Sequence, residues 1–160
     1  MFFRDKYSFL SNFAFVPTGI YYNGIRFNTV ENAFQAAKCK SKQEMYRFVN
    51  ISPVNAKKLG RFVILRDDWD SIKLKVMQDL LSQKFEYREF ACKLKGTGDI
   101  YIVEENYWHD NFWGVCKCSR CSGKINPKEQ NHLGTLLMRT RSQIKSQIPT
   151  PEMDKEPYIR

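Results

Sequence analysis

The chain has 160 residues and a formal net charge of +9, and 42% of its residues are hydrophobic. This composition predicts one folded domain and excludes a disordered chain, while the lack of any apolar run of about 18 residues excludes a membrane-spanning helix. The positive charge favours an anionic partner, either nucleic acid or a phosphorylated small molecule, although a basic surface that meets only solvent is the alternative. The first residues lack the pattern of a signal peptide, so we expect a cytoplasmic or nuclear protein with no membrane partner.

The first part of the chain carries the signals of strands. Residues 7–15 alternate aromatic and small polar side chains, which predicts a strand and a turn. Residues 20–27 predict a hairpin, because Asn23-Gly24 supply the positive φ angles of a two-residue turn between β-branched and aromatic residues. An amphipathic helix over residues 29–40 follows.

The rest of the chain predicts mainly helices. They are expected over residues 42–50, from Pro53 to a stop at Gly60, and over residues 70–84, 88–95 and 131–147, with short apolar runs at residues 61–65 and 100–103. The loop that extends to residue 130 exceeds the usual length, which favours a functional role. We predict an α+β fold in one mostly helical domain over residues 1–148, whose strands are the hairpin and one near Ile100, followed by a disordered tail over residues 149–160.

The helix over residues 29–40 has a polar edge that is unusual for its place. With 3.6 residues per turn, Lys38 lies within about 20° of Glu31 around the helix, and Gln35 about 40° away. This edge borders the apolar stripe of the same helix, so a carboxylate, an amide and an amine would lie beside the core as one wall of an active site. Alternatively, Asn28 and Glu31 have the spacing of a capping box, and Glu31 then only closes the start of the helix.

The five cysteines do not predict a disulfide framework, because their number is odd and no signal peptide precedes them. We expect Cys39 and Cys92 to be small buried residues. Cys116, Cys118 and Cys121 are close enough in sequence to hold a structural zinc ion, with His109 or His132 as a fourth ligand. Only one C-x-x-C pair is present, so loop thiols with packing or redox roles are the alternative.

Several further segments carry more polar and aromatic residues than a plain helical domain requires. Together with the helix described above, the ordered set is Phe9-Leu10-Ser11-Asn12-Phe13; Glu31 with Phe34-Gln35 and Lys38; Gly60-Arg61; Trp69 with Lys73 and Met77; Lys84-Phe85; Thr97-Gly98-Asp99 with Glu104; Asp110 with Trp113-Gly114; and Asn131-His132-Leu133-Gly134 with Leu137-Met138 and Arg141. Each segment alone has an ordinary structural explanation. The set in this order resembles the NADAR superfamily, also called YbiA-like, over about residues 7–142.

The resemblance implies chemistry at the bond between a ribose and a nitrogen atom. Family members are similar to hydrolases that remove ADP-ribose from modified guanine, or to enzymes that cleave riboflavin-biosynthesis intermediates. Breaking such a bond needs a carboxylate near the sugar and a proton for the leaving base, and Glu31 and Asp99 are our candidates. A lysine that traps the opened sugar as a Schiff base is another route, with Lys38 the first candidate and Lys73 the second. Lys38 as an ordinary surface lysine is the alternative.

The remaining candidates would bind the substrate. Arg61 suits a pyrophosphate, Ser11 and Asn12 add neutral donors, and Trp69 and Trp113 offer faces on which a base can stack. We expect Trp108 to belong to the core or the loop packing, and Asn131 either contacts the ligand or caps the last helix. Gln35, Asp110 and Gly114 complete the predicted binding residues.

We therefore predict a cofactor-free N-glycosidase that acts on ADP-ribosylated guanine in nucleosides or nucleic acid. The alternatives are an enzyme of riboflavin-pathway intermediates, a non-catalytic module that binds NAD or ADP-ribose, and a basic nucleic-acid-binding protein.

Overall fold

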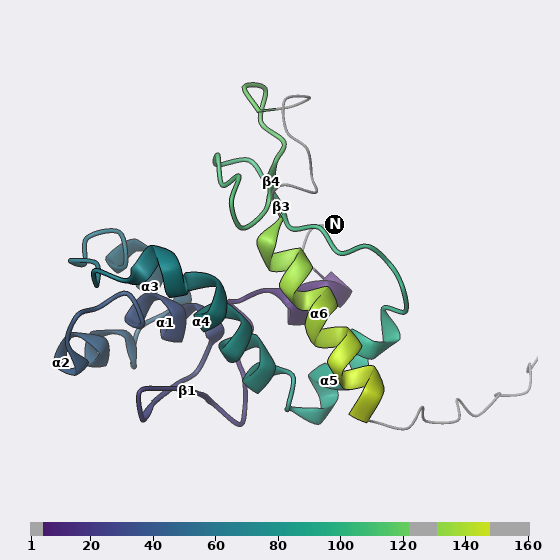
Figure 1. Cartoon of the computed structure of the whole chain (residues 1–160), viewed down its shortest axis with the longest axis horizontal. Helices are drawn as coiled ribbons and strands as arrows, with labels where there is room; N and C mark the ends of the chain where they lie inside the picture. Colours follow the sequence, from purple (N-terminus) through teal and green to yellow (C-terminus); the bar gives the residue numbers. More distant parts are fainter. Residues whose placement is uncertain (1–4, 122–130, 148–160) are drawn as a thin grey trace, which may run out of the picture.

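The computed structural model describes residues 5–121 and 131–147, so the predicted tail and the last part of the long loop lie outside the described residues. The fold is α+β and mostly helical, as predicted (Figure 1). Its helices are α1 (Val30–Ala36), α2 (Lys42–Met45), α3 (Pro53–Leu59), α4 (Trp69–Lys84), α5 (Arg88–Gly96) and α6 (His132–Gln147), with 3₁₀ turns at Asp5–Leu10 and Tyr46–Phe48. Within these residues no helix combines the length and apolar character that crossing a membrane requires.

Two small sheets complete the described part of the fold. Strands β1 (Ile20–Tyr22) and β2 (Ile25–Phe27) form the predicted antiparallel hairpin, and Asn23 and Gly24 have the positive φ angles that its turn requires. Strands β3 (Glu105–Asn106) and β4 (Val115–Cys116) pair in parallel. Figure 1 shows this second pair at the end of α6 where that helix begins, while the hairpin lies near α1 and α4.

Helix α1 is the centre of the core, because every one of its residues is buried. It packs against α3, α4 and the β1–β2 hairpin. Polar side chains on this helix are therefore enclosed, and Asn32 shows the consequence: its amide donates to the carbonyls of Phe48 and Ile51, at 2.7 and 2.8 Å. The N-cap is Thr29, whose hydroxyl accepts a hydrogen bond from the backbone N–H of Asn32 at 3.1 Å. The capping-box interpretation of Asn28 and Glu31 is therefore wrong, and the Glu31 carboxylate is available for another role.

Three predicted elements are shorter or of another kind. Residues 7–15 form the end of a 3₁₀ helix and turns in place of a strand, because Phe9 and Leu10 turn into the core. Helix α1 ends at Ala36, four residues before the predicted end, since the chain turns so that the Lys38 carbonyl accepts from the Arg66 amide at 2.9 Å. Helix α2 passes into the 3₁₀ turn at Tyr46–Phe48.

The strand expected near Ile100 is also displaced, since pairing begins only at Glu105. The backbone before it is held by a side chain in place of a neighbouring strand. Asn131 donates its amide to the Ile102 carbonyl and accepts from the Glu104 N–H, both at 2.9 Å. The Asn131 side chain thus supplies hydrogen bonds to this backbone that a neighbouring strand would otherwise supply.

The other helices follow the prediction closely. Helix α3 has Ser52 as its N-cap and Gly60 as its C-cap, and α4 and α5 differ from their predicted bounds by one residue. Helix α6 buries Leu133, Leu136, Leu137 and Ile144, as its pattern predicted. Cys39 is buried as expected, whereas Cys92 is exposed on α5.

Candidate active site

A cavity of about 290 Å³ lies between helix α1, helix α3 and the segment that leads from β3 to β4. Its polar lining consists of Ser11, Asn12, Glu31, Lys57, Glu104, Glu105 and Asp110. Its aromatic lining consists of Phe13, Phe34, Tyr107, Trp108 and Trp113. Four carboxyl groups and a lysine therefore meet aromatic surface in one cavity, an arrangement typical of ligand and active sites.

Glu31 lines the cavity from helix α1 and is only 5% exposed. Its carboxylate accepts a hydrogen bond from Gln35 Nε2 at 2.9 Å, one helical turn away. Burial raises the pKa of Glu31, while Lys57, Gln35 and Lys38 act in the opposite direction. Burial thus disfavours the charged form of Glu31, and three neighbouring side chains partly offset that effect.

Gln35 is held in place by a glycine on the next helix. A Cβ atom on Gly60 would lie 1.8 Å from Gln35 Oε1 and 3.1 Å from the Gln35 Cβ. The end of α3 can therefore approach α1 this closely only because residue 60 has no side chain. The packing of Gly60 against Gln35 explains this glycine without any role in phosphate binding. Arg61 itself is exposed and does not line the cavity.

Glu104 provides the opposing carboxylate. Its Oε2 atom is buried, and none of the described residues donates a hydrogen bond to it. Burial, with smaller contributions from the negative charges of Asp110 and Glu31, raises the pKa of Glu104 to about 7, and Lys57 opposes this rise. At neutral pH Glu104 is therefore a carboxylic acid for a large part of the time, able to give up a proton.

The backbone of Glu104 is fixed from both sides. Its N–H donates to Asn131, and its carbonyl accepts from the Val115 N–H at 2.7 Å. A Cβ atom on Gly114 would lie 2.4 Å from that carbonyl oxygen, so only glycine permits the approach. Gly114, predicted to bind substrate, instead allows the chain to pack behind Glu104.

Lys57 is the basic group of the cavity lining, and it comes from α3. Its Nζ lies 5.2 Å from the ring centroid of Trp108 and 5.9 Å from that of Phe13, within the range of cation–π attraction. Lys57 also acts electrostatically on both Glu31 and Glu104. It thus faces the two carboxylates and spans the two sides of the cavity.

The structure brings together five of the predicted site residues in the cavity lining: Ser11, Asn12, Glu31, Asp110 and Trp113. Gln35 and Lys38 stand behind Glu31, and the Lys38 Nζ lies 3.5 Å from the Gly60 carbonyl. Burial lowers the pKa of Lys38, and Glu31 partly offsets this. Lys38 is therefore a half-buried amine close to the cavity.

The other predicted residues lie outside the lining. Asp99 is exposed after α5, in a turn that Arg141 anchors by donating to Thr97 Oγ1 and to the Ile100 carbonyl. Trp69 is buried against Phe34, with ring centroids 5.0 Å apart, and Lys73 pairs with Asp70 at 2.7 Å. Asn131 has 0% exposure and uses its amide on the backbone before β3. The cavity that Glu31 shares with Trp113 is thus lined by neither Asp99 nor Arg61.

Sequence reasoning assigned no role in the site to Glu104, Lys57 and Trp108. Glu104 ends an apolar run, and that position was a usable signal. Trp108 was expected in the core or the loop packing; it is 58% exposed, so it is not a core residue, and it lines the cavity. Lys57 has no local signal, since it lies on another helix than Glu31.

Lys84, part of the Lys84-Phe85 motif, is the most deeply buried charged side chain among the described residues. Its Nζ donates to the carbonyl of Ser11 at 2.7 Å, and burial lowers the pKa of Lys84 to about 7. It thereby positions the Ser11 turn at the edge of the cavity.

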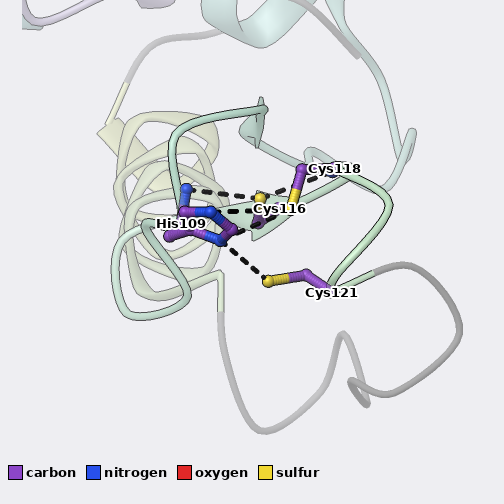
Figure 2. A group of neighbouring side chains, drawn as sticks. All are labelled: His109, Cys116, Cys118 and Cys121. Carbon is purple, nitrogen blue, oxygen red and sulfur yellow. Dashed lines mark hydrogen bonds between the residues drawn. The ribbon is translucent and has the colours of Figure 1, made fainter.

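A second cluster lies beside the cavity on the same loop. Its members are His109, Cys116, Cys118 and Cys121, and Figure 2 shows the imidazole turned toward the sulfur atoms. His132, the other candidate for a fourth ligand, instead packs on Phe112 with ring centroids 4.3 Å apart.

Comparisons with known proteins show the family and a similar fold. The NADAR domain family model matches residues 1–145. N-glycosidase YbiA of Escherichia coli (strain K12) is 36% identical over 146 residues, which cover 88% of this chain and 83% of that protein. The chloroplastic riboflavin biosynthesis protein PYRR of Zea mays is 31% identical over 135 residues, covering 76% of this chain but 20% of that protein. The NMR structure of the E. coli protein YbiA matches with a TM-score of 0.72 at 30% identity, covering 92% of this chain and 85% of that one.

Proposed function

This chain belongs to the NADAR domain family and is an enzyme of the N-glycosidase kind, and from that premise we propose that it removes ADP-ribose from ADP-ribosylated guanine in nucleosides or nucleic acid. The observation that carries the proposal is the pair Glu31 and Glu104, which face one cavity from different elements. Two carboxyl groups with different surroundings can divide the acid and base roles of such a reaction.

The two roles follow from the surroundings of each group. Glu104, whose pKa is raised to about 7, is the general acid that protonates the leaving base nitrogen. Glu31, whose charge is supported by Lys57, Gln35 and Lys38, stabilises the positive charge that develops on the sugar. Glu31 then accepts a proton from the attacking water. The C1′–N bond breaks, a C1′–O bond forms, and one proton reaches the base, so the reaction balances as a hydrolysis.

A lysine offers a second route through the same cavity. An N-glycoside that opens its sugar ring exposes C1′ to an amine, which forms a Schiff base that water later hydrolyses. Lys38 is the candidate chosen from the sequence, and its lowered pKa favours the reactive neutral amine. Lys57 lines the cavity and is a further candidate, while the ion pair with Asp70 makes Lys73 the weakest of the three.

The lining fits the part of the substrate around the scissile bond. The volume of about 290 Å³ is at the lower end of the range of about 300–1,000 Å³ for ligand pockets. A nucleobase with its sugar would be enclosed, with Trp108, Trp113 and Phe13 offering surfaces for stacking. The phosphates would extend toward the basic exterior of the chain. The reaction uses only side chains, and we propose that it needs no cofactor.

The experiment is a comparison of two substrates. We expect the protein to release guanosine from ADP-ribosylated guanosine faster than it cleaves a pyrimidine ribosyl phosphate of the riboflavin pathway. Release of the base is followed by chromatography, with Glu31→Gln as the inactive control. Binding of ADP-ribose without turnover of either compound would contradict the proposal and favour a non-catalytic module.

A riboflavin-pathway substrate is the second candidate. It is favoured by the relationship to PYRR, whose name places that protein in riboflavin biosynthesis. Turnover of the pyrimidine compound alone would establish this candidate and overturn the first.

A further inference from the structure

We propose that His109, Cys116, Cys118 and Cys121 bind one structural Zn²⁺ ion, which fixes the loop side of the cavity. The proposal concerns metal binding by the chain and stands whether or not the proposed substrate is right. Only its consequence for activity depends on the proposed function.

The spacing of the four ligand atoms fits a tetrahedral ion. All four atoms lie within 4.8 Å of one another, and His109 Nδ1 lies 3.3 Å from both Cys118 Sγ and Cys121 Sγ (Figure 2). With Zn–S near 2.3 Å and Zn–N near 2.0–2.1 Å, tetrahedral geometry separates nitrogen from sulfur by about 3.6 Å. Small side-chain rotations would therefore place one ion at bonding distance from all four.

The surrounding backbone is already arranged for thiolates. The His109 N–H points to Cys116 Sγ at 3.3 Å, and the Cys118 N–H points to the same sulfur at 3.5 Å. Asn111 Nδ2 donates to Cys121 Sγ at 3.3 Å. Donors of this kind stabilise metal-bound sulfur and orient it.

His109 adopts an unusual backbone conformation, with a φ of +64°. A non-glycine residue in this region is uncommon and requires support from its surroundings. In this conformation both the imidazole and the backbone N–H of His109 face the sulfurs. A ligand at the centre of the cluster would provide the support that this conformation needs.

The donor set selects the metal and its role. Three thiolates and one imidazole suit zinc, and four protein ligands form a closed structural site with no position left for substrate. The ion would fix the loop at Trp108 and Asp110, which flank the ligand His109. It would also fix β3, because the ligand Cys116 belongs to β4, which pairs with β3. Each of these places leads to a residue of the cavity lining.

The test measures metal bound to the full chain. Protein purified from zinc-supplemented medium without chelators should contain about one zinc ion per chain, and Co²⁺ in its place should give intense thiolate charge-transfer absorption. Cys118→Ser and Cys121→Ser should lose most of the metal and that absorption. Cys92→Ser is the matched control, because Cys92 is an exposed thiol on α5 outside the cluster, and it should keep both.

The outcomes separate this site from the proposed reaction. Wild-type protein that contains less than about a tenth of a zinc ion per chain, with no charge-transfer absorption on adding Co²⁺, would overturn the site. Equal metal in Cys92→Ser and Cys118→Ser would overturn it as well. If the Cys118 variant fails to fold, the metal content and the Co²⁺ spectrum of the wild type still decide. A chain that binds zinc but cleaves neither substrate would support the zinc site and contradict only the proposed function.

Discussion

The two sides of the cavity differ in how they are held. The helical wall consists of Glu31 on α1 and Lys57 on α3, and the loop wall consists of Glu104, Asp110 and Trp113. The helical wall stands on two regular helices, since α1 is wholly buried and α3 packs against it. The loop wall is held by two strands of two residues each and by the side chain of Asn131.

The proposed catalytic pair thus combines a rigid half with a half that depends on a few contacts. The carboxylate on the helical wall is positioned by core packing, which many residues share. The carboxylate on the loop wall depends on a few hydrogen bonds, so single substitutions should disturb it.

Glu31→Gln should abolish most of the activity while leaving the fold intact. The variant keeps the shape and the hydrogen bond from Gln35 but loses the charge that the developing cation needs, so we expect turnover to fall by about 10²–10⁴-fold. Base release measured under single-turnover conditions checks this. Glu86→Gln, at an exposed position after α4, is the control and should be fully active. Full turnover by the Glu31 variant would show that the Glu31 carboxylate has no role in the reaction.

Glu104→Gln should change how stability depends on pH. Between its ordinary pKa of 4.5 and the raised pKa of about 7, the folded state holds a proton that the unfolded state releases. Wild-type stability should therefore fall as pH rises through this window, by up to about 3 kcal/mol. The variant cannot release this proton, so its stability should not fall in this window. Its free energy of unfolding should match that of the wild type near pH 4.5 and exceed it at pH 8. Urea unfolding at both pH values makes the comparison, and parallel profiles would show that Glu104 is not buried.

Asn131→Asp should loosen the loop wall and spare the helical one. Aspartate keeps the shape of the side chain but cannot donate to the Ile102 carbonyl, and leaving that buried group unpaired costs about 1–3 kcal/mol. Hydrogen exchange should increase at residues 101–106 and stay unchanged in α1. Equal increases in both places would show that the two walls do not differ in the way described.

Gly60→Ala should disturb the packing of the helical wall. The added Cβ would overlap Gln35, which must move away from Glu31, and we expect a loss of about 1–3 kcal/mol in stability with reduced activity. Gly96→Ala is the matched control, because nothing lies within 4 Å of a Cβ placed there. It should be neutral or stabilising. Similar results for the two variants would mean that Gln35 is not confined.

The regular elements and the polar row on α1 are what the sequence could predict. The turn at Asn23-Gly24, the cap at Ser52 and the apolar pattern of α6 are local signals, and each element forms where its signal lies. The row of Glu31 and Gln35 follows from helical spacing alone, and these two side chains do meet.

The loop wall depends on contacts that no local pattern reveals. Residues 100–103 have the composition of a strand, yet their partner is the side chain of Asn131, far along the chain. Asp99 and Glu104 are both acidic residues near the same apolar run, and only the tertiary structure decides which one enters the cavity. Lys57 likewise reaches the site because α3 packs against α1.

The most direct test of the shared cavity is an NMR titration of carboxyl carbons in protein labelled at glutamate. We expect one resonance with a midpoint near pH 7 that is missing in Glu104→Gln, and a lower midpoint for that resonance in Glu31→Gln, since the Glu31 charge raises the pKa of Glu104. A Glu104 resonance that titrates near 4.5 and does not respond to the Glu31 substitution would contradict the account.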